Sequence, residues 1–282
     1  MQPLTEAVSR SSRIAFPALR LTVDPPAGFT VLGREIYFYG VVIALAFLAG
    51  TGWCAKKAKH FGIDEDSVYD TLLWLLPVSI LGARAYYVLF QWDYYAAHLR
   101  EIPAIWEGGL AIYGGVIAGI LVITAVCRHK KIRLGAMLDL FAAACLLGQS
   151  IGRWGNFFNR EAFGCETDSF LRMGLETSSG TFIYVHPTFL YESLWNLLGF
   201  LLLNRFISTG KRRYDGQCLW LYFLWYGTGR AWIEGLRTDS LLIGSTGIRV
   251  SQLLSLLLAV TGAVILILKR KRAGEPNPRQ EE

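Results

Sequence analysis

The sequence predicts an all-α membrane protein with seven transmembrane helices, and two observations support this prediction. Of the 282 residues, 53% are hydrophobic, and they gather into runs that approach the roughly 20 residues of a membrane-spanning helix. The basic residues give a formal net charge of +6 and lie between these runs, where positive charge orients a membrane protein. With no basic-aromatic recognition module, this distribution argues against a nucleic-acid partner.

Seven apolar runs are interpreted as spanning helices of one membrane domain, residues 36–268. They are residues 36–54, 70–91, 109–127, 137–151, 187–206, 216–235 and 247–268. The fourth run is short, and we allow its helix to continue through Trp154. None of the five cysteines forms a metal-spaced pair, and the four within or beside the runs are interpreted as apolar filler.

Residues 1–35 lack the pattern of a signal peptide. Three arginines interrupt any apolar core, namely Arg10, Arg13 and Arg20. The Pro25-Pro26 pair would break a helix. We therefore expect an N-terminal arm that lies on the membrane surface.

The basic clusters alternate between loops and so predict an orientation. They follow the first, third, fifth and seventh runs, at residues 56–59, 128–133, 205–213 and 269–272. The positive-inside rule makes these loops cytoplasmic. The N-terminus is then outside, residues 269–282 form a basic, then disordered, cytoplasmic tail, and residues 153–186 form an extracytoplasmic head or a flap over a substrate.

The chain is organised around residues 152–164, which read Gly-Arg-Trp-Gly-Asn-Phe-Phe-Asn-Arg-Glu-Ala-Phe-Gly. This stretch directly follows the fourth run. Ionisable groups at membrane depth are costly, and are therefore candidates for function. The structural alternative is a helix end capped by Asn156, with Arg153 snorkelling to the interface.

With the orientation set, polar residues of several runs fall in the outer half of the membrane. Tyr226, Arg230, Glu234 and Arg237 are spaced four, four and three residues apart, which places them on one helix face. The other members are Tyr39, Arg84, Tyr113, Arg153, Asn156, His186 and Glu192. Asp139 lies too deep to join them and is interpreted as structural or as cytoplasmic-interfacial.

Arginine outnumbers glutamate by two in this outer region. The residues counted are Arg84, Arg153, Arg160, Arg230 and Arg237 against Glu161, Glu192 and Glu234. Excess buried positive charge is unfavourable unless an anion completes it, and a guanidinium binds phosphate oxygens in a bidentate manner. The sequence therefore predicts a site for a phosphate-bearing lipid of the outer leaflet, without a nucleotide or zinc-protease motif.

Structural roles remain open for several of these residues. Glu234 could serve simply to neutralise Arg230 and Arg237. Arg84 could pair with Glu192 and serve only to hold two helices together. Tyr39 and Tyr226 could be interfacial belt residues, and His186 before Pro187 could be a helix-start residue. The glycines of residues 108–119 indicate close helix packing rather than a phosphate loop.

Four motifs in order resemble those of bacterial prolipoprotein diacylglyceryl transferases. Beside residues 152–164 they are Gly-Gly-Leu-Ala-Ile-Tyr-Gly-Gly at 108–115, His-Pro-Thr-Phe-Leu-Tyr-Glu at 186–192 and Arg-Ala-Trp-Ile-Glu-Gly-Leu-Arg at 230–237. The resemblance covers about residues 30–270 and implies transfer of diacylglycerol from phosphatidylglycerol to the lipobox cysteine of a prolipoprotein. It also implies the bacterial inner membrane as location, an active site toward the extracytoplasmic leaflet, and no metal or cofactor.

The resemblance assigns roles residue by residue. It implies that Arg153 and Arg230 are essential. The further positions it implies are Tyr39, Asn156, Glu161, Gly164, Tyr226, Glu234 and Arg237. Some family members carry a histidine, the proposed base, where this chain has Tyr113. Because position 113 is a tyrosine, activation of the thiol by a histidine there is excluded. A tyrosine hydroxyl is itself a poor base at neutral pH.

The mechanistic hypothesis has Arg153 and Arg230 holding the phosphate and stabilising the leaving glycerol phosphate. Tyr113 relays a proton or binds the head group, and His186 is the fallback base; the identity of the base stays open. Two other classes compete: an anion or lipid transporter, and a membrane transferase that uses Cys165 as its nucleophile.

Overall fold

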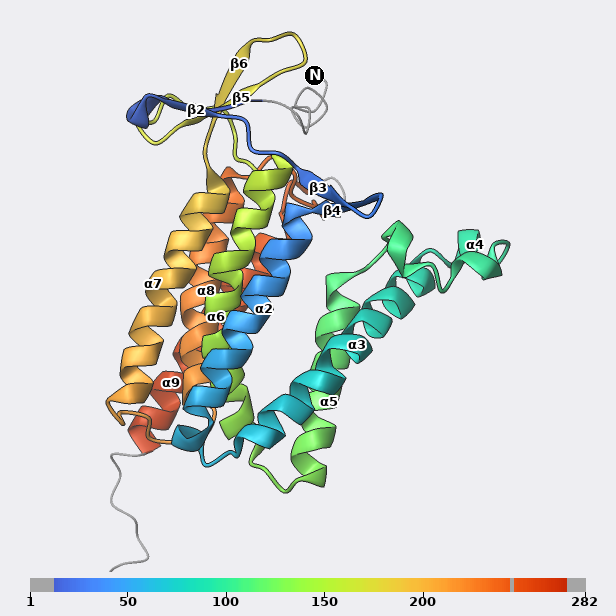
Figure 1. Ribbon diagram of the computed structural model, residues 1–282. Coiled ribbons are helices and arrows are strands. Elements are labelled where there is room, and N and C mark those ends of the chain that lie inside the picture. Colours follow the sequence, from blue (N-terminus) through green and yellow to red (C-terminus); the bar gives the residue numbers. More distant parts are fainter. Residues whose placement is uncertain (1–12, 244–245, 273–282) are drawn as a thin grey trace, which may run out of the picture. The chain divides into compact units, whose positions relative to one another are not determined.

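The computed structural model describes residues 13–243 and 246–272, and a long helix lies at each of the seven positions read from the sequence (Figure 1). These are α2 (Phe38–Lys57), α3 (Glu65–Phe90), α5 (Ile112–His129), α6 (Leu134–Asn159), α7 (Thr188–Ser208), α8 (Gln217–Leu236) and α9 (Val250–Arg272). Five of them, α2, α3, α5, α6 and α9, are long and apolar enough to cross a membrane. The chain is therefore a multi-pass helical membrane protein.

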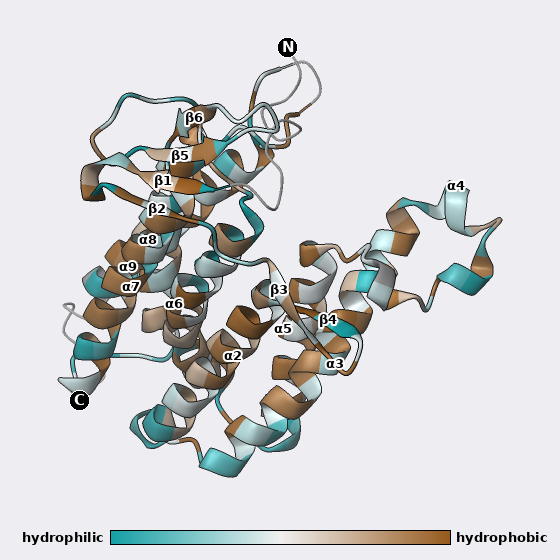
Figure 2. Ribbon diagram, turned by 45° about the horizontal axis from the view of Figure 1, so that its top comes forward, coloured by the Kyte–Doolittle hydropathy of each residue, from teal (hydrophilic) through white to brown (hydrophobic). Residues whose placement is uncertain are grey.

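The chain divides into two compact units. The first comprises Met1–Gly50 and Ala142–Glu282, and the second comprises Thr51–Phe141. The first unit contains α7, α8 and α9 with most of α2 and α6, whereas the second contains α3 and α5. Along α2 and α3, Figure 2 shows hydrophobic residues in the middle of each helix and hydrophilic residues at the ends near residues 56–66, as expected for helices in a bilayer.

Helix α6 is longer than the predicted run 137–151. It continues to Asn159, beyond the Trp154 that we allowed, and so Arg153 and Asn156 both lie on the helix and the segment expected at 153–186 begins later. Hydropathy alone ends the run too early, because the polar side chains in this last part are paired with other side chains of the first unit. The loop that follows therefore starts at Arg160.

Glycines allow α2 and α6 to approach closely. A Cβ atom at Gly155 would lie 2.7 Å from Cδ2 of Tyr39, and one at Gly152 would lie 3.4 Å from Cδ1 of Ile43. Small residues at such positions bring helix backbones together in membranes. The ring of Tyr39 is thereby held against the helix that carries Arg153.

A reciprocal tryptophan pair joins α7 to α8. The rings of Trp195 and Trp225 stack with centroids 4.5 Å apart, and each indole N–H donates to the main-chain carbonyl of the other residue, both at 3.0 Å. Gly199 and Gly229 make room for these rings, because a Cβ atom at either would lie within 2.3 Å of an indole nitrogen. This pair holds α7 against α8 close to their charged residues, since Trp195 follows Glu192 on α7 and Trp225 precedes Arg230 on α8.

The all-α prediction is incomplete, because the first unit also contains two sheets. A four-stranded antiparallel sheet has the order β2-β1-β5-β6. Its strands are β1 (Ile14–Phe16), β2 (Leu21–Val23), β5 (Met173–Glu176) and β6 (Phe182–Val185). The strand residues Ile14, Leu175 and Val185 are fully buried and pack with Phe163 and Phe189. The sheet therefore packs against the segment where α6 ends and α7 begins.

The described part of the expected N-terminal arm forms strands. Residues 14–23 supply β1 and β2, with Ile14 paired to Leu175 of β5, and a separate hairpin joins β3 (Gly28–Val31) to β4 (Arg34–Tyr37). The Leu32-Gly33 turn of that hairpin has positive φ at both residues, the geometry that matches strand twist. Residues 1–12 of the arm and 273–282 of the predicted tail lie outside the described residues.

In the second unit, α3 and α5 pack through facing glycines. A Cβ atom at Gly114 would lie 2.3 Å from both the Gly82 carbonyl oxygen and Cβ of Tyr86, and one at Gly82 would lie 2.4 Å from Cβ of Ala118. The prediction of close helix packing is confirmed for Gly114, Gly115 and Gly119, which face α3, whereas Gly108 and Gly109 lie before α5 and a Cβ atom at Gly108 would meet nothing within 4 Å.

We expect Gly114→Ala to destabilise the protein by about 1–3 kcal/mol, because the new methyl group meets backbone and Cβ atoms that cannot move aside. Gly52→Ala is the matched control, since a Cβ atom at Gly52 meets nothing within 4 Å, and alanine favours a helix. Thermal unfolding of the detergent-solubilised protein should show a lower midpoint for Gly114→Ala only. Equal midpoints for both variants would contradict the packing assignment.

Candidate functional site

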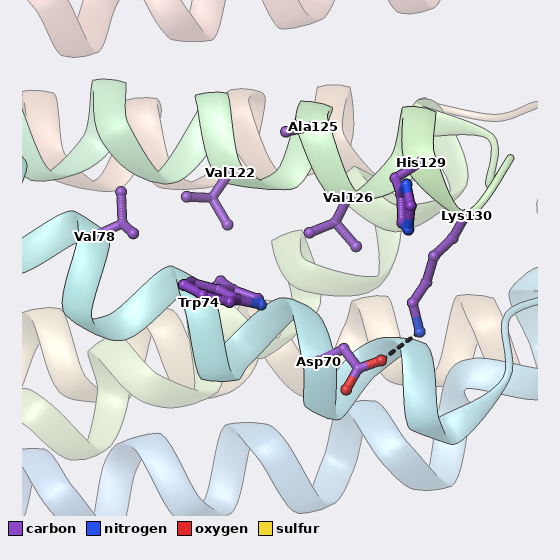
Figure 3. A pocket seen from close by; sticks show the side chains of 8 residues that line it. All are labelled: Asp70, Trp74, Val78, Val122, Ala125, Val126, His129 and Lys130. Atoms are coloured by element: carbon purple, nitrogen blue, oxygen red, sulfur yellow. Dashed lines mark hydrogen bonds and ion pairs between the residues drawn. The ribbon is translucent and has the colours of Figure 1, made fainter.

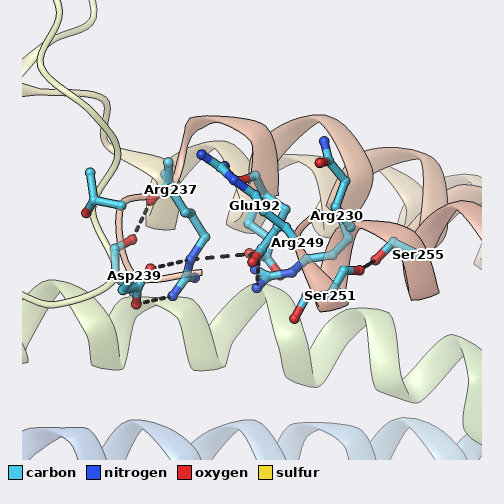
Figure 4. A network of polar contacts seen from close by, with 12 residues as sticks. Glu192, Arg230, Arg237, Asp239, Arg249, Ser251 and Ser255 are labelled. Atoms are coloured by element: carbon cyan, nitrogen blue, oxygen red, sulfur yellow. Dashed lines mark hydrogen bonds and ion pairs between the residues drawn. The ribbon is translucent and has the colours of Figure 1, made fainter. Parts of the chain in front are cut away.

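The site is built around the carboxylate of Glu192, in the second turn of α7. This side chain is only 3% exposed, and its Oε1 lies 2.5 Å from Nη2 of Arg153 on α6. Its Oε2 lies 2.8 Å from Nη1 of Arg230 on α8. One buried carboxylate therefore joins three helices and orients the two arginines that the sequence singled out. Figure 4 shows Glu192 beside Arg230.

The α6 arm of this network continues toward the following loop. Nη1 of Arg153 donates to Oδ1 of Asn156 at 3.2 Å, and Nδ2 of Asn156 donates to Oε1 of Glu161 at 2.9 Å. Asn159 donates to the same oxygen at 3.3 Å. Asn156 and Glu192 thus bind different terminal nitrogens of the Arg153 guanidinium group, which restricts its rotamers.

The α8 part of the network contains charged residues that the sequence predicts to share one helix face. Glu234 is buried, and its Oε2 lies 2.5 Å from Nη2 of Arg230 and 3.9 Å from Nε of Arg237, as ion pairs without a hydrogen bond to that oxygen. Arg237 binds Asp239 through two hydrogen bonds of 2.9 and 2.7 Å. Burial disfavours ionisation of Asp239, but the bonds from Arg237 outweigh it and hold the pKa of this carboxyl below its ordinary value.

The start of α9 closes the network. Arg249 donates to the main-chain carbonyl of Glu234, and Gln252 donates to that of Ala231 at 2.9 Å. The Glu234 carbonyl lies in the last turn of α8, where it also accepts from the N–H of Arg237 at 3.2 Å, so both bonds attach the start of α9 to the end of α8. Figure 4 shows Arg249 reaching this helix end beside Arg230 and Arg237.

The expected excess of arginine is not found in this network. Arg160 instead donates to Asp24 at 3.0 Å and to the Pro25 carbonyl at 2.6 Å, so it binds the N-terminal segment to the head. The network then contains four carboxylates and four guanidinium groups: Glu161, Glu192, Glu234 and Asp239 with Arg153, Arg230, Arg237 and Arg249. Excess charge therefore cannot be what attracts an anion here.

The arginines nevertheless keep accessible donors. The side chains of Arg153 and Arg230 are 23% and 13% exposed. A guanidinium has five N–H donors, and the interactions with Glu192, Asn156 and Glu234 occupy only part of each set. Both groups are thus oriented by carboxylates and still able to donate to phosphate oxygens.

Two predicted tyrosines border the network in the first unit. Tyr39 is 37% exposed and lies against Gly155, one residue before Asn156. Tyr226 lies one turn before Arg230 on α8, and its ring stacks on that of Tyr222 with centroids 5.5 Å apart. Neither position is deeply buried in apolar packing, which leaves both available to a ligand.

Gly164 joins three segments of the chain. Its N–H donates to the His186 carbonyl at 2.9 Å, and it pairs with Arg237 in an antiparallel bridge. A Cβ atom here would lie 2.7 Å from Cβ of His186 and 3.0 Å from the Leu236 carbonyl oxygen. Gly164 therefore positions Arg237 and His186 through backbone contacts.

His186 lies just before α7. Its Nδ1 is 3.3 Å from the hydroxyl of Tyr191. Burial lowers the pKa of this imidazole, which keeps the ring neutral at neutral pH and able to accept a proton.

Arg84 and Tyr113 belong to the second unit. Arg84 is buried and donates to the main-chain carbonyls of Glu101, Ile102, Gly108 and Gly109 at 2.6–3.2 Å. Its partners in the structure are thus carbonyls of its own unit, which gives it a structural role there. Tyr113 lies in the first turn of α5, 42% exposed, beside Tyr86.

A cavity of about 550 Å³ lies between α3 and α5 in this unit (Figure 3). Val78, Val122 and Val126 line it, and an ion pair between Lys130 and Asp70 borders one end. None of the predicted site residues lines this cavity. Within residues 13–243 and 246–272, no group of three or more His, Cys, Asp or Glu side chains could hold a metal ion.

Sequence reasoning missed three members of the network: Asn159, Asp239 and Arg249. Asn159 and Asp239 were detectable, because each lies two residues from a charged residue that it contacts, Glu161 and Arg237. Arg249 had no local signal, since its partner is a helix-end carbonyl fifteen residues away.

Comparison with known proteins identifies the relatives of this chain. A family model described as prolipoprotein diacylglyceryl transferase matches residues 26–268. The chain is 44% identical over 244 residues to a phosphatidylglycerol--prolipoprotein diacylglyceryl transferase of Finegoldia magna, covering 86% of this chain and 95% of the relative. It is 42% identical over 262 residues to that of Pediococcus pentosaceus (90% and 93% covered) and 43% identical over 242 residues to that of Streptococcus pyogenes serotype M5 (85% and 93% covered).

We expect Glu192→Gln to destabilise the protein by about 3–5 kcal/mol, because it leaves two guanidinium groups facing each other without their shared counter-charge. The control is Glu166→Gln at an exposed carboxylate, which should change stability by less than about 0.5 kcal/mol. Unfolding in detergent micelles measures both. If the two variants unfold alike, the carboxylate does not hold the three helices together.

Proposed function

The chain belongs to the prolipoprotein diacylglyceryl transferase family, and from this premise we propose that it transfers the diacylglyceryl group of phosphatidylglycerol to the lipobox cysteine of a prolipoprotein. The observation that carries the proposal, beyond family membership, is the Arg153–Glu192–Arg230 arrangement: two oriented guanidinium groups joined by one carboxylate. This geometry suits a phosphodiester lipid, since guanidinium N–H groups match phosphate oxygens.

The reaction is a substitution at the diacylglyceryl carbon that bears the phosphate oxygen. The sulfur of the cysteine thiolate forms a bond to that carbon as the carbon–oxygen bond breaks. The electron pair leaves with the oxygen of glycerol phosphate, and the thiol proton passes to a base or to water. A thioether and glycerol phosphate are the products, and no redox step or soluble cofactor is required.

In this scheme Arg153 and Arg230 bind the phosphate and stabilise the negative charge that the leaving group gains. Charge stabilisation is most effective when the donors are oriented beforehand. Glu192 and Asn156 supply that orientation for Arg153, and Glu192 and Glu234 supply it for Arg230. The carboxylates also keep the empty site near neutrality, so that a lipid can bind and leave.

The proposal gives the remaining candidates supporting roles. Glu161 supports Asn156, Gly164 fixes the chain between His186 and Arg237, and Tyr39 and Tyr226 offer hydroxyl groups to the lipid. The arginines would lower the pKa of the substrate thiol from its usual value of about 8.5. Tyr113 could relay the released proton, with His186 as the alternative acceptor and Arg84 supporting the loop that precedes Tyr113.

We further propose that all seven long helices span the bacterial inner membrane, with the N-terminus outside and the C-terminus in the cytoplasm. The buried charges of α7 and α8 are paired with one another, which reduces the cost of placing these helices in lipid. The sheet formed by β1, β2, β5 and β6 would then form the extracytoplasmic head, and the active site would open to the outer leaflet.

Two rival functions are less well supported. A transporter needs polar groups through the full membrane thickness, whereas the network described above is confined to the end of the helices nearest the head. A transferase with Cys165 as nucleophile uses an exposed thiol, and would lose activity in Cys165→Ser. The family function requires that this variant stay active.

The direct test is incubation of the purified protein with phosphatidylglycerol labelled in its acyl chains and a lipobox peptide. We expect label on the peptide cysteine, and a rate lowered at least about 100-fold in Arg153→Ala or Arg230→Ala, the loss typical when a charge-stabilising donor is removed. Arg34→Ala, at an exposed position of β4, is the control. Near-normal transfer by folded Arg153→Ala and Arg230→Ala would exclude the mechanism.

The base is tested by the dependence of kcat/KM on pH. If His186 accepts the proton, kcat/KM rises with pH through a value below 6.5, because burial lowers this pKa, and His186→Gln removes that rise. If Tyr113 relays the proton, Tyr113→Phe lowers kcat while His186→Gln does not. Unchanged profiles in both variants would assign proton removal to water.

A further inference from the structure

A second cavity lies in the first unit, at the ends of α7, α8 and α9 that carry the basic loops. Its volume is about 730 Å³. It is lined by the loop between α7 and α8, by the first turns of α8 and by the last turns of α9. None of the residues assigned to transfer lies in it.

Four cations border this cavity: Lys211, Arg213, Lys269 and Arg270. All four side chains are exposed, and none is ion-paired with a carboxylate in the part of the chain that the structure describes. The nearby carboxylate of Asp215 is already bound by Arg212. Like charges around one cavity repel each other, and an anion placed between them removes that repulsion.

Part of the wall of the same cavity is apolar. Phe206, Leu221 and Leu266 line it beside the cations, and Lys269 lies over the ring of Tyr214, 5.4 Å from its centroid. A ligand that fills this space must therefore combine an anionic group with hydrocarbon. Free phosphate satisfies only the first requirement.

We propose that this cavity binds an anionic phospholipid of the leaflet on its side of the membrane, with the phosphate between Lys211, Arg213, Lys269 and Arg270 and an acyl chain against Phe206, Leu221 and Leu266. Basic residues at the end of membrane helices interact favourably with anionic head groups. The site is separate from catalysis. Only its assignment to the cytoplasmic leaflet rests on the proposed orientation.

The test uses the full-length protein in phosphatidylcholine vesicles that contain phosphatidic acid with a photoreactive group on its acyl chain. After illumination, peptide mass spectrometry locates the attached lipid. We expect attachment within residues 206–221 and 262–270. Because attachment is located by position, this result is independent of whether the protein also binds lipid at the Arg153–Arg230 centre.

The variant Lys211→Gln/Arg213→Gln should weaken attachment at these residues by about 30-fold, the product expected when two basic residues leave an anionic lipid surface. The matched control is Lys56→Gln/Arg205→Gln, which removes two exposed cations that do not line the cavity. Both variants should keep their transfer activity and their orientation, measured by the protease accessibility of the C-terminus.

Three outcomes would overturn the proposal. Equal losses in the two variants would mean that the cations act only as a general positive surface. Attachment elsewhere, or attachment unchanged by Lys211→Gln/Arg213→Gln, would mean that the cavity does not hold the lipid. Loss of attachment in excess inorganic phosphate would mean that free phosphate is the ligand.

Discussion

The structure of the first unit depends on the carboxylate of Glu192 between Arg153 and Arg230. In a membrane protein an unpaired charge at this position would be prohibitively unfavourable. The carboxylate accepts from one arginine through each of its oxygens, at 2.5 and 2.8 Å, and so its buried charge is balanced by two partly exposed guanidinium groups. Because the partners lie on α6, α7 and α8, the requirement for pairing also specifies how these helices must approach one another.

Close packing makes that pairing possible. The stacked Trp195 and Trp225 hold α7 against α8, and Gly155 allows Tyr39 to lie directly on α6. At the end of the bundle, the main-chain bonds of Gly164 fix the segments that carry His186 and Arg237. The site is therefore supported by packed helices and by main-chain hydrogen bonds of the first unit, as required for groups that must be oriented before a reaction begins.

Neutral pairing has a functional consequence. A site with surplus positive charge would retain its anionic product as strongly as its substrate, whereas arginines matched by carboxylates bind through their remaining N–H groups. In the proposed mechanism, donor geometry rather than net charge then discriminates a phosphodiester lipid from other lipids. The unpaired cations bordering the cavity between α7, α8 and α9 present the contrasting case, in which charge itself attracts the ligand.

The sequence by itself determined the helix positions, because long apolar runs have no other stable state in a bilayer, and it determined the family, because four spaced motifs are specific. It also located Arg153, Asn156, Arg230 and Glu234, since charged residues in apolar runs are conspicuous. Only the tertiary structure decided their partners. Residues 14–23 become strands because β5, more than 150 residues later, supplies their hydrogen bonds. Arg160 and Arg84 do not belong to the network around Glu192, because Arg160 binds Asp24 and Arg84 binds main-chain carbonyls such as that of Glu101. Contacts between residues so far apart in the sequence leave no local pattern in it.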